Sequence, residues 1–246
     1  MERRKEIEKE FHNKIRLVHD DQHVADTRWS PVIEATIRNN PLWKNMKYYS
    51  VERKSREFVL NWFENNCKGK HVLDYCAGNG EDGVFIAKHG AAKVTGIDIS
   101  DVSIENCKNL ANINNLSKVT EYMVSDAENT LFEDESFDII TEYGALHHLD
   151  RARAFPEMAR ILRPDGKIIC NEALGHNPVI HWYRKKTPHL RTEWEAEHIM
   201  RKNDFELARR YFKNIEIHFF HLFTLLAVPF RKSGFFFTMV ECFGKY

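Results

Sequence analysis

The chain has 246 residues, and its 36 Lys and Arg residues balance 36 Asp and Glu residues, so the formal net charge is zero. This length suits one α/β domain with appendages and a sizeable hydrophobic core. Because the chain has no excess of positive charge and no basic block, we do not expect nucleic acid as a partner. The five cysteines are scattered without C-x-x-C spacing, which predicts reduced thiols, no metal site and a cytoplasmic protein.

The N-terminal region has a polar, helix-forming sequence. Residues 2–18 carry mixed charges at i,i+4 spacing, which predicts an exposed helix, and residues 51–63 predict an amphipathic helix. We therefore expect residues 1–66 to form an N-terminal helical extension. No transmembrane segment is expected, because the start is too charged for a signal peptide and the most apolar run, residues 219–230, is too short to span a bilayer.

A glycine-rich turn follows this extension. Residues 70–83 read KHVLDYCAGNGEDG, in which a short apolar run ends at Asp74 and small residues then lead into a helix. This pattern predicts the first strand, turn and helix of a nucleotide-binding α/β fold. The spacing also fits the Gly-x-Gly-x-x-Gly fingerprint of dinucleotide sites, so NAD stays open. The Asp74 carboxylate, with no Lys or Arg in the loop, suits a cationic ligand such as S-adenosylmethionine better than a pyrophosphate.

Strands and helices alternate after this turn. Asp98 ends the second predicted strand, eighteen residues after Gly80 (98 − 80), close to the ~20 expected for an acid that binds ribose hydroxyls. Asp126 follows the third strand, where it could accept from an adenine amino group or serve as a cap. The alternation predicts a doubly wound parallel sheet. The predicted strands cover residues 92–97, 119–124, 136–141 and 167–172, the predicted helices cover residues 84–89, 100–115 and 150–162, and a turn is predicted at residues 163–166.

The alternation ends after residue 173. Residues 174–202 combine aromatic, histidine and basic side chains and are too long for a simple connection, so we expect an inserted cap over the site. The predicted fold is a doubly wound, mostly parallel, seven-stranded Rossmann-like α/β sheet with N-terminal helices and this cap after the fifth strand. In this predicted fold, residues 67–246 form one domain. The last predicted elements are a helix at residues 204–211 and an antiparallel strand pair at residues 214–220 and 234–242.

Taken in order, these motifs resemble the class I S-adenosylmethionine-dependent methyltransferases, which have a seven-strand Rossmann-like domain. The resemblance covers about residues 70–173, with the family's order and spacing. The family usually has glycine where this chain has Cys76, and we expect a structural substitution there rather than a reactive thiol. The matching segments are VLDYCAGNG at residues 72–80, GIDIS at 96–100, SDA at 125–127, FDII at 137–140, LHHL at 146–149 and LRPDGK at 162–167.

The resemblance implies that S-adenosylmethionine is the cofactor and S-adenosylhomocysteine its product. It assigns the methionine end of the cofactor to Asp74 and the Gly78–Gly80 loop, the ribose hydroxyls to Asp98 and the adenine amino group to Asp126. Tyr49 either packs in the fold or closes over the cofactor. The predicted cofactor-binding residues are Asp74, Ala77, Gly78, Gly80, Asp98, Ile99, Asp126, Ala127, Tyr49 and Glu142.

Methyl transfer is an in-line displacement, so positioning supplies much of the catalysis, and a base is needed only if the acceptor must lose a proton. The predicted catalytic residues are His147, His148 and Glu142, although a loop-fixing role for each stays open. The Asn/Asp-Pro-Pro-Tyr/Phe motif of adenine and amide methyltransferases is absent at Glu142 and Tyr143, which disfavours those substrates. The predicted acceptor-binding residues are Tyr143, Glu172, His176, His181, Tyr183 and Arg191.

We therefore predict an enzyme that moves a methyl group to an O or N nucleophile of a small-molecule metabolite. Three alternatives stay open: a protein-methylating enzyme, an NAD-dependent Rossmann oxidoreductase and a cofactor-binding scaffold without turnover. The sequence leaves the acceptor and the oligomeric state open, a homodimer included.

Overall fold

The computed structural model describes residues 2–17, 28, 30, 49–176, 182, 184–187 and 191–221, with the backbone only at residues 49–52. The chain divides into two compact units. Residues 1–25 and 64–215 form the first, and residues 26–63 and 216–246 form the second. The sheet and the candidate site belong to the first unit.

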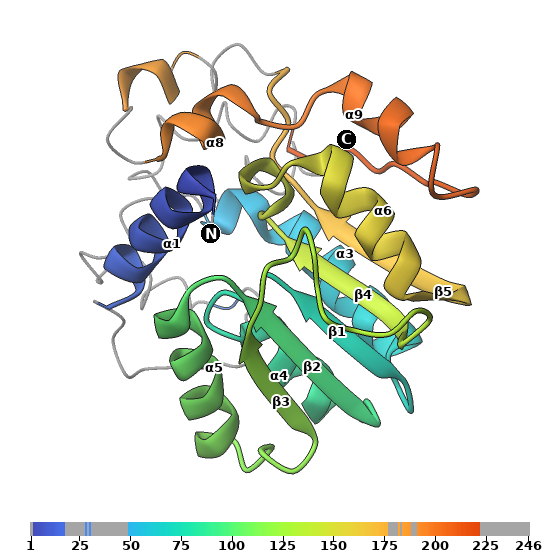
Figure 1. Cartoon of the computed structure of the whole chain (residues 1–246). Coiled ribbons are helices and arrows are strands. Elements are labelled where there is room, and N and C mark those ends of the chain that lie inside the picture. Colours follow the sequence, from blue (N-terminus) through green and yellow to red (C-terminus); the bar gives the residue numbers. More distant parts are fainter. Residues whose placement is uncertain are drawn as a thin grey trace. The chain divides into compact units, whose positions relative to one another are not determined.

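A five-stranded sheet in the order β3-β2-β1-β4-β5 is the centre of the first unit, and every strand pair is parallel (Figure 1). The strand order reverses between β1 and β4, which places a topological switch point at the carboxyl ends of these strands. The predicted parallel Rossmann-like arrangement is confirmed. The strands are β1 (His71–Tyr75), β2 (Lys93–Asp98), β3 (Thr120–Val124), β4 (Phe137–Tyr143) and β5 (Leu162–Asn171).

The predicted sheet of seven strands is not fully observed. Residues 214–220 form no strand, although their alternating apolar side chains predicted one. A strand needs a partner for its backbone groups as well as an alternating pattern. The predicted partner, residues 234–242, lies outside the described residues.

Most predicted helices lie within a few residues of their expected places. Capping explains two of the helix starts: Ser100 accepts a hydrogen bond from the Ser103 amide, and Asp150 accepts one from the Ala152 amide. Among the described residues, no helix is both long and apolar enough to cross a membrane. The helices are α1 (Arg3–Arg16), α3 (Tyr49–Asn66), α4 (Glu81–Lys88), α5 (Asp101–Ile113), η2 (Leu146–His148), α6 (Arg151–Ile161), α8 (Glu193–Glu197) and α9 (Lys202–Ala208).

Two hydrophobic clusters join the helices to the sheet. In the first, Leu73 of β1 and Ile140 of β4 are fully buried and pack in one cluster with Phe155 of α6. In the second, Val84 of α4 packs with Ile104 of α5. Burial of such large side chains contributes about 1.5–3 kcal/mol each, so this packing fixes the strand ends that carry the site.

Helix α1 is not the exposed helix that the sequence predicts. Its Lys5 and Glu8 side chains are buried, with only 5% and 4% exposure, and the helix packs against α5 (Figure 1). Buried charges require partners, and acidic side chains at the ends of the strands supply them to Lys5. The prediction was wrong because it allowed only apolar faces to be buried.

The expected turn at residues 163–166 is instead a bulge within β5. Phe137 of β4 pairs with Leu162, and Ile139 pairs with Lys167, so β4 advances two residues while β5 advances five. Residues 163–166 therefore leave the ladder, as their Arg-Pro-Asp-Gly sequence requires. The sequence identified the irregularity, but the strand already begins at Leu162.

The unusual Cys76 takes a left-handed backbone conformation, with φ at 61°. Glycine adopts this conformation without strain, whereas a residue with a Cβ atom is strained by about 1–2 kcal/mol. Burial, with the nearby Asp98 and Glu142 carboxylates, raises the pKa of the Cys76 thiol well above its ordinary value. The structure therefore favours a strained, unreactive substitution in a turn that is built for glycine.

This strain predicts that Cys76→Gly is more stable than Cys76→Ala by about 1 kcal/mol, since both variants remove the thiol and only glycine relieves the backbone. Urea unfolding of the two variants measures the difference. A more stable alanine variant would show that the left-handed conformation carries no strain here.

Candidate active site

In the glycine turn between β1 and α4, neighbouring side chains lie very close to the glycine backbone. Gly78 has a φ of 59°, and its amide donates to Asp98 Oδ2 at 3.0 Å. A Cβ atom on Gly83 would lie 2.7 Å from the Tyr122 hydroxyl and 2.8 Å from Asp74 Oδ2. The buried Asp74 in turn accepts from the Gly83 amide at 3.0 Å. In this structure Asp74 thus fixes the start of α4 and the shape of the loop.

Two acids stand at the carboxyl edge of the sheet next to this turn. Asp98 ends β2, and its Oδ1 accepts from the Ser100 amide at 2.8 Å. Asp126 lies just beyond β3, and its Oδ1 accepts from the Glu128 amide at 2.9 Å. An ionised carboxylate has about four acceptor positions, so both acids keep capacity for a ligand's hydroxyl or amino group.

A cavity of about 80 Å³ lies between these acids and the segment after β4. Ligand pockets usually measure about 300–1,000 Å³, so this cavity is small for a cofactor. Five of the residues that line it come from α1. The described residues that line it are Arg4, Lys5, Glu8, His12, Arg16, Cys76, Asp98, Ile99, Asp126, Ala127, Glu128, Tyr143, Gly144, Ala145, His148 and Leu149.

The α1 side chains place positive charge against Asp126 and the glycine turn. Lys5 Nζ lies 2.7 Å from Asp126 Oδ2 and 2.8 Å from Glu128 Oε2. The Arg16 guanidinium lies over the glycine turn, where a Cβ atom on Gly78 would come within 2.9 Å of it. A ligand that reaches Asp126 Oδ2 must therefore share or displace Lys5. The sequence did not identify Lys5 and Arg16 as residues of the site, although a charged helix without a strong apolar stripe was itself a sign that charged partners hold it in place.

Three of the predicted residues, which do not line the cavity, form a buried acid–histidine group. Glu142 Oε1 accepts from the amides of Ala145 and Leu146. Glu172 Oε1 accepts from the Leu146 amide at 2.5 Å, and its Oε2 lies 2.7 Å from His147 Nδ1. The group therefore holds the segment between β4 and α6 in place.

These neighbours shift the pKa values of Glu142 and Glu172 in opposite directions. Burial and the Glu172 carboxylate raise the pKa of Glu142 well above its ordinary value. Burial alone would raise the pKa of Glu172, but the hydrogen bond from His147 outweighs it and lowers that pKa. The pair therefore carries one proton on Glu142 and one charge on Glu172.

His148, unlike His147, lines the cavity and meets α1. Its Nδ1 lies 2.9 Å from Glu8 Oε2, His12 Nε2 lies 3.6 Å from the same oxygen, and the Thr192 hydroxyl donates to Glu8 Oε1. Burial opposes ionisation of Glu8, but the hydrogen bonds from His12 and His148 lower its pKa to about 2. Burial lowers the pKa of His148, so its imidazole is neutral near pH 7.

The structure brings some predicted residues to the cavity and not others. Asp98, Ile99, Asp126 and Ala127 line it, as do Tyr143 and His148, while Ala77 and Gly80 belong to the neighbouring turn. Arg191 is used locally, because its Nη1 donates to the carbonyls of Arg184 at 3.0 Å and Thr187 at 2.6 Å. His176 is exposed after β5. Tyr49 begins α3 without a described side chain, and His181 and Tyr183 lie outside the described residues.

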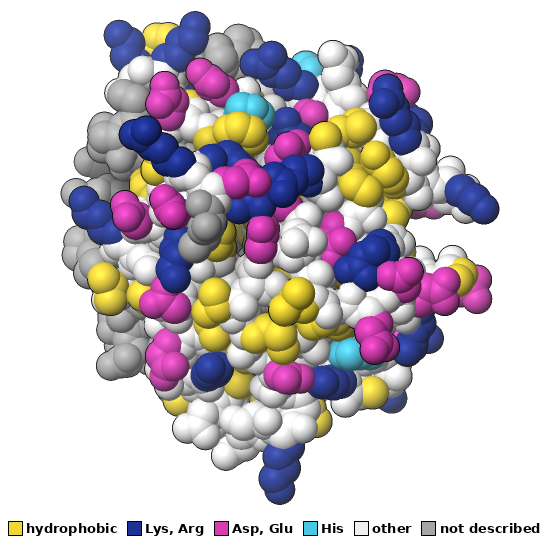
Figure 2. Space-filling model, in the orientation of Figure 1, with side chains coloured by type: hydrophobic (Ala, Val, Ile, Leu, Met, Phe, Trp, Pro, Cys, Tyr) yellow, Lys and Arg dark blue, Asp and Glu magenta, His cyan; other side chains and the backbone are white. Residues whose placement is uncertain are grey.

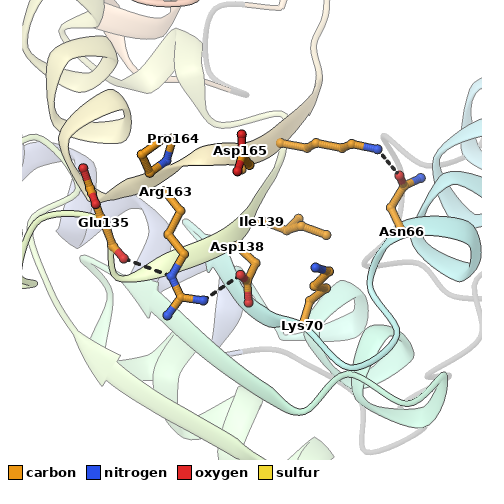
Figure 3. Close-up of a pocket in the computed structure, with 10 residues that line it drawn as sticks. Asn66, Lys70, Glu135, Asp138, Ile139, Arg163, Pro164 and Asp165 are labelled. Carbon is orange, nitrogen blue, oxygen red and sulfur yellow. Dashed lines mark hydrogen bonds and ion pairs between the residues drawn. The ribbon is translucent and has the colours of Figure 1, made fainter.

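A larger cavity, of about 490 Å³, lies at the opposite edge of the sheet, where β4 and β5 begin (Figure 3). Two of its basic side chains have partners within the cavity wall: Arg163 lies 2.6 Å from Asp138 Oδ1, and Lys167 donates to Asn66 Oδ1 at 2.8 Å. None of the predicted site residues that the structure describes lines it. Ligands of open parallel sheets bind at the carboxyl edge, so the smaller cavity is the candidate site.

Charged side chains of both signs are interleaved on the face shown in Figure 2, with hydrophobic groups between them. This mixture agrees with the balanced composition of the chain.

The low pKa of Glu8 predicts that α1 docking depends on pH. A carboxyl whose pKa falls from 4.5 unfolded to about 2 folded stabilises the fold above pH 4.5 and loses that stabilisation as pH falls towards 2. The free energies of unfolding of the wild type and of Glu8→Gln are measured with urea in EDTA. The wild type should be the more stable protein, and the difference should decrease by about 2 kcal/mol between pH 7 and pH 3. Both proteins keep His12 and His148. Glu10→Gln, on the exposed side of α1, is the control. An advantage that does not change with pH would contradict the prediction.

Comparison with known proteins shows which family and which proteins this chain is similar to. Residues 73–170 match the family described as "Methyltransferase domain". The chain is 32% identical over 118 residues to a phthiotriol/phenolphthiotriol dimycocerosates methyltransferase of Mycobacterium ulcerans, covering 46% of this chain and 41% of that protein. It is 39% identical over 102 residues to a ubiquinone biosynthesis O-methyltransferase of Coxiella burnetii, covering 41% of this chain and 42% of that protein. The chain thus spans about two fifths of the length of both relatives.

The fold also matches solved structures. A geranyl diphosphate C-methyltransferase from Streptomyces coelicolor A3(2), solved with S-adenosyl-L-homocysteine, aligns with a TM-score of 0.64 at 14% identity, over 98% of this chain and 93% of that one. At this identity the likeness concerns the fold alone. The domain match over residues 73–170, the sequence relatives and this fold together support a class I S-adenosylmethionine-dependent methyltransferase.

Proposed function

We propose that this chain transfers the methyl group of S-adenosylmethionine to an oxygen or nitrogen nucleophile of a small-molecule acceptor. The observation that carries the proposal is the composition of one cavity wall. Asp98 and Asp126 line one part of it, and Tyr143 and His148 line another. One cavity thus combines acids that suit an adenosyl cofactor with polar side chains that suit an acceptor.

The cofactor would bind over the glycine turn. Asp98 would accept from the ribose hydroxyls and Asp126 from the adenine amino group, while the methionine end would lie over the Gly78 backbone in place of the Arg16 guanidinium. When bound, the cofactor supplies a methyl group on a positively charged sulfur, which leaves as a neutral thioether. The chain's part is to align the nucleophile with that methyl group and to exclude water.

We assign different roles to the three predicted catalytic residues. His148 lines the cavity and is neutral near pH 7, so it is placed to act on a proton of the acceptor. Glu142 and His147 instead hold the segment that carries His148. They are positioning residues in this proposal.

The name of one sequence relative supports an oxygen nucleophile, because the Coxiella protein is named an O-methyltransferase. The Streptomyces structure, which is similar in fold alone, is named a C-methyltransferase. Residues 174–202 are the proposed acceptor cap. Their described parts support this role, because Leu174 bridges Met200 and the two ends of the insertion therefore meet. The scattered cysteines support a cytoplasmic location.

Labelled cofactor tests the substrate class. The chain is incubated with methyl-labelled S-adenosylmethionine and either the small-molecule or the protein fraction of a lysate, and label should enter the small-molecule fraction. Label in protein alone would overturn the proposed acceptor class. A thermal shift with S-adenosylhomocysteine larger than that with NAD is expected, and the reverse order would favour an oxidoreductase.

Substitutions separate the proposed roles. His148→Ala should lower kcat by about 10²-fold or more, the usual contribution of a general acid or base. Glu142→Gln should change kcat less than about tenfold, because the amide oxygen still accepts from the Ala145 and Leu146 amides and a neutral side chain replaces a protonated one. The reverse order of the two losses would make Glu142 the base.

A further inference from the structure

Glu8, His12 and His148 bring three metal-ligating groups together beside the cofactor cavity. One ligand atom of each lies within 4.8 Å of the others. The distances measured to Glu8 Oε2 are 2.9 Å from His148 Nδ1 and 3.6 Å from His12 Nε2. All three residues line the same cavity, with Glu8 only 4% exposed.

The local structure presents these side chains as a metal site would. Glu8 and His12 are four residues apart on α1, so they share one face of the helix. His148 approaches that face from η2, and the imidazole rings of His12 and His148 lie 4.7 Å apart between centroids. Thr192 donates to Glu8 Oε1, a second contact of the kind that orients metal-ligating carboxylates.

The donor types also suit a cation, because imidazole nitrogens and carboxylate oxygens are both metal ligands in proteins. Two imidazoles and one carboxylate favour borderline divalent ions such as Zn²⁺, Co²⁺ or Fe²⁺ over Mg²⁺, which prefers oxygen ligands. The sequence alone predicted no metal, because Glu8 and His148 are 140 residues apart.

We propose that Glu8, His12 and His148 form a divalent transition-metal site whose open positions face the cofactor cavity. Metal binding rests on the cluster itself. Its catalytic consequence rests on the proposed function: an acceptor hydroxyl bound to the metal would release its proton to water more readily, so with metal bound His148 would serve as a ligand in place of its role as base.

Cobalt provides a direct probe of the site. Tag-free full-length chain is stripped with EDTA, dialysed and titrated with Co²⁺ while the visible d–d absorption is recorded, and Zn²⁺ is then added as a competitor. We expect one Co²⁺ per chain, displaced by Zn²⁺ and not by the same concentration of Mg²⁺. Glu8→Gln, His12→Ala and His148→Ala should each weaken Co²⁺ binding by about tenfold or more.

Matched controls come from the same unit of the chain. Glu10→Gln removes an exposed carboxylate from α1, and His89→Ala removes the imidazole that lies 3.2 Å from Glu64. Both should bind Co²⁺ as the wild type does. The proposal is overturned if the wild type binds no more tightly than Glu8→Gln, or if His89→Ala weakens binding as much as His12→Ala. S-adenosylhomocysteine affinity, measured without metal, shows separately whether the cofactor site works.

Discussion

The pairing of buried charge between α1 and the carboxyl edge of the sheet is the interaction on which the candidate site depends. Lys5 meets Asp126 and Glu128, and the Glu128 side chain has no exposed surface. Removing one partner of a buried ion pair typically costs about 3–5 kcal/mol, because the other charge stays buried without compensation. Helix α1 is therefore held over the acids, and these contacts leave a cavity of only about 80 Å³.

A second layer of polar contacts supports the opposite wall. The sequence predicted catalytic roles for Glu142 and His147 and acceptor binding for Glu172, yet in the structure these side chains contact backbone amides and one another. Their value lies in holding η2, which presents His148 to the cavity. In the proposed function, rigid support of this kind would keep His148 within the narrow geometry that the displacement requires.

Predictions from the sequence succeeded where a local pattern has one structural solution. The apolar run before Asp74 can only be a buried strand that leads into a glycine turn. Because the later apolar runs repeat this strand–helix unit, the sequence predicted a parallel sheet. Predictions failed where burial depends on distant partners. Helix α1 has no strong apolar stripe, and only acids more than 100 residues away explain why Lys5 is buried. Residues 214–220 are the opposite case. Their local pattern predicted a strand, but among the described residues no strand pairs with them.

The sequence by itself therefore determined the order of the strands along the chain, the glycine turn and the acids at the strand ends, because each depends on neighbours within a few residues. It also marked Cys76 as unusual, although only its left-handed backbone explained the strain. The tertiary structure alone decided which of two adjacent histidines reaches the cavity and which residues of α1 close it. Those outcomes depend on the direction in which side chains leave η2 and α1 and on charges that meet only after folding.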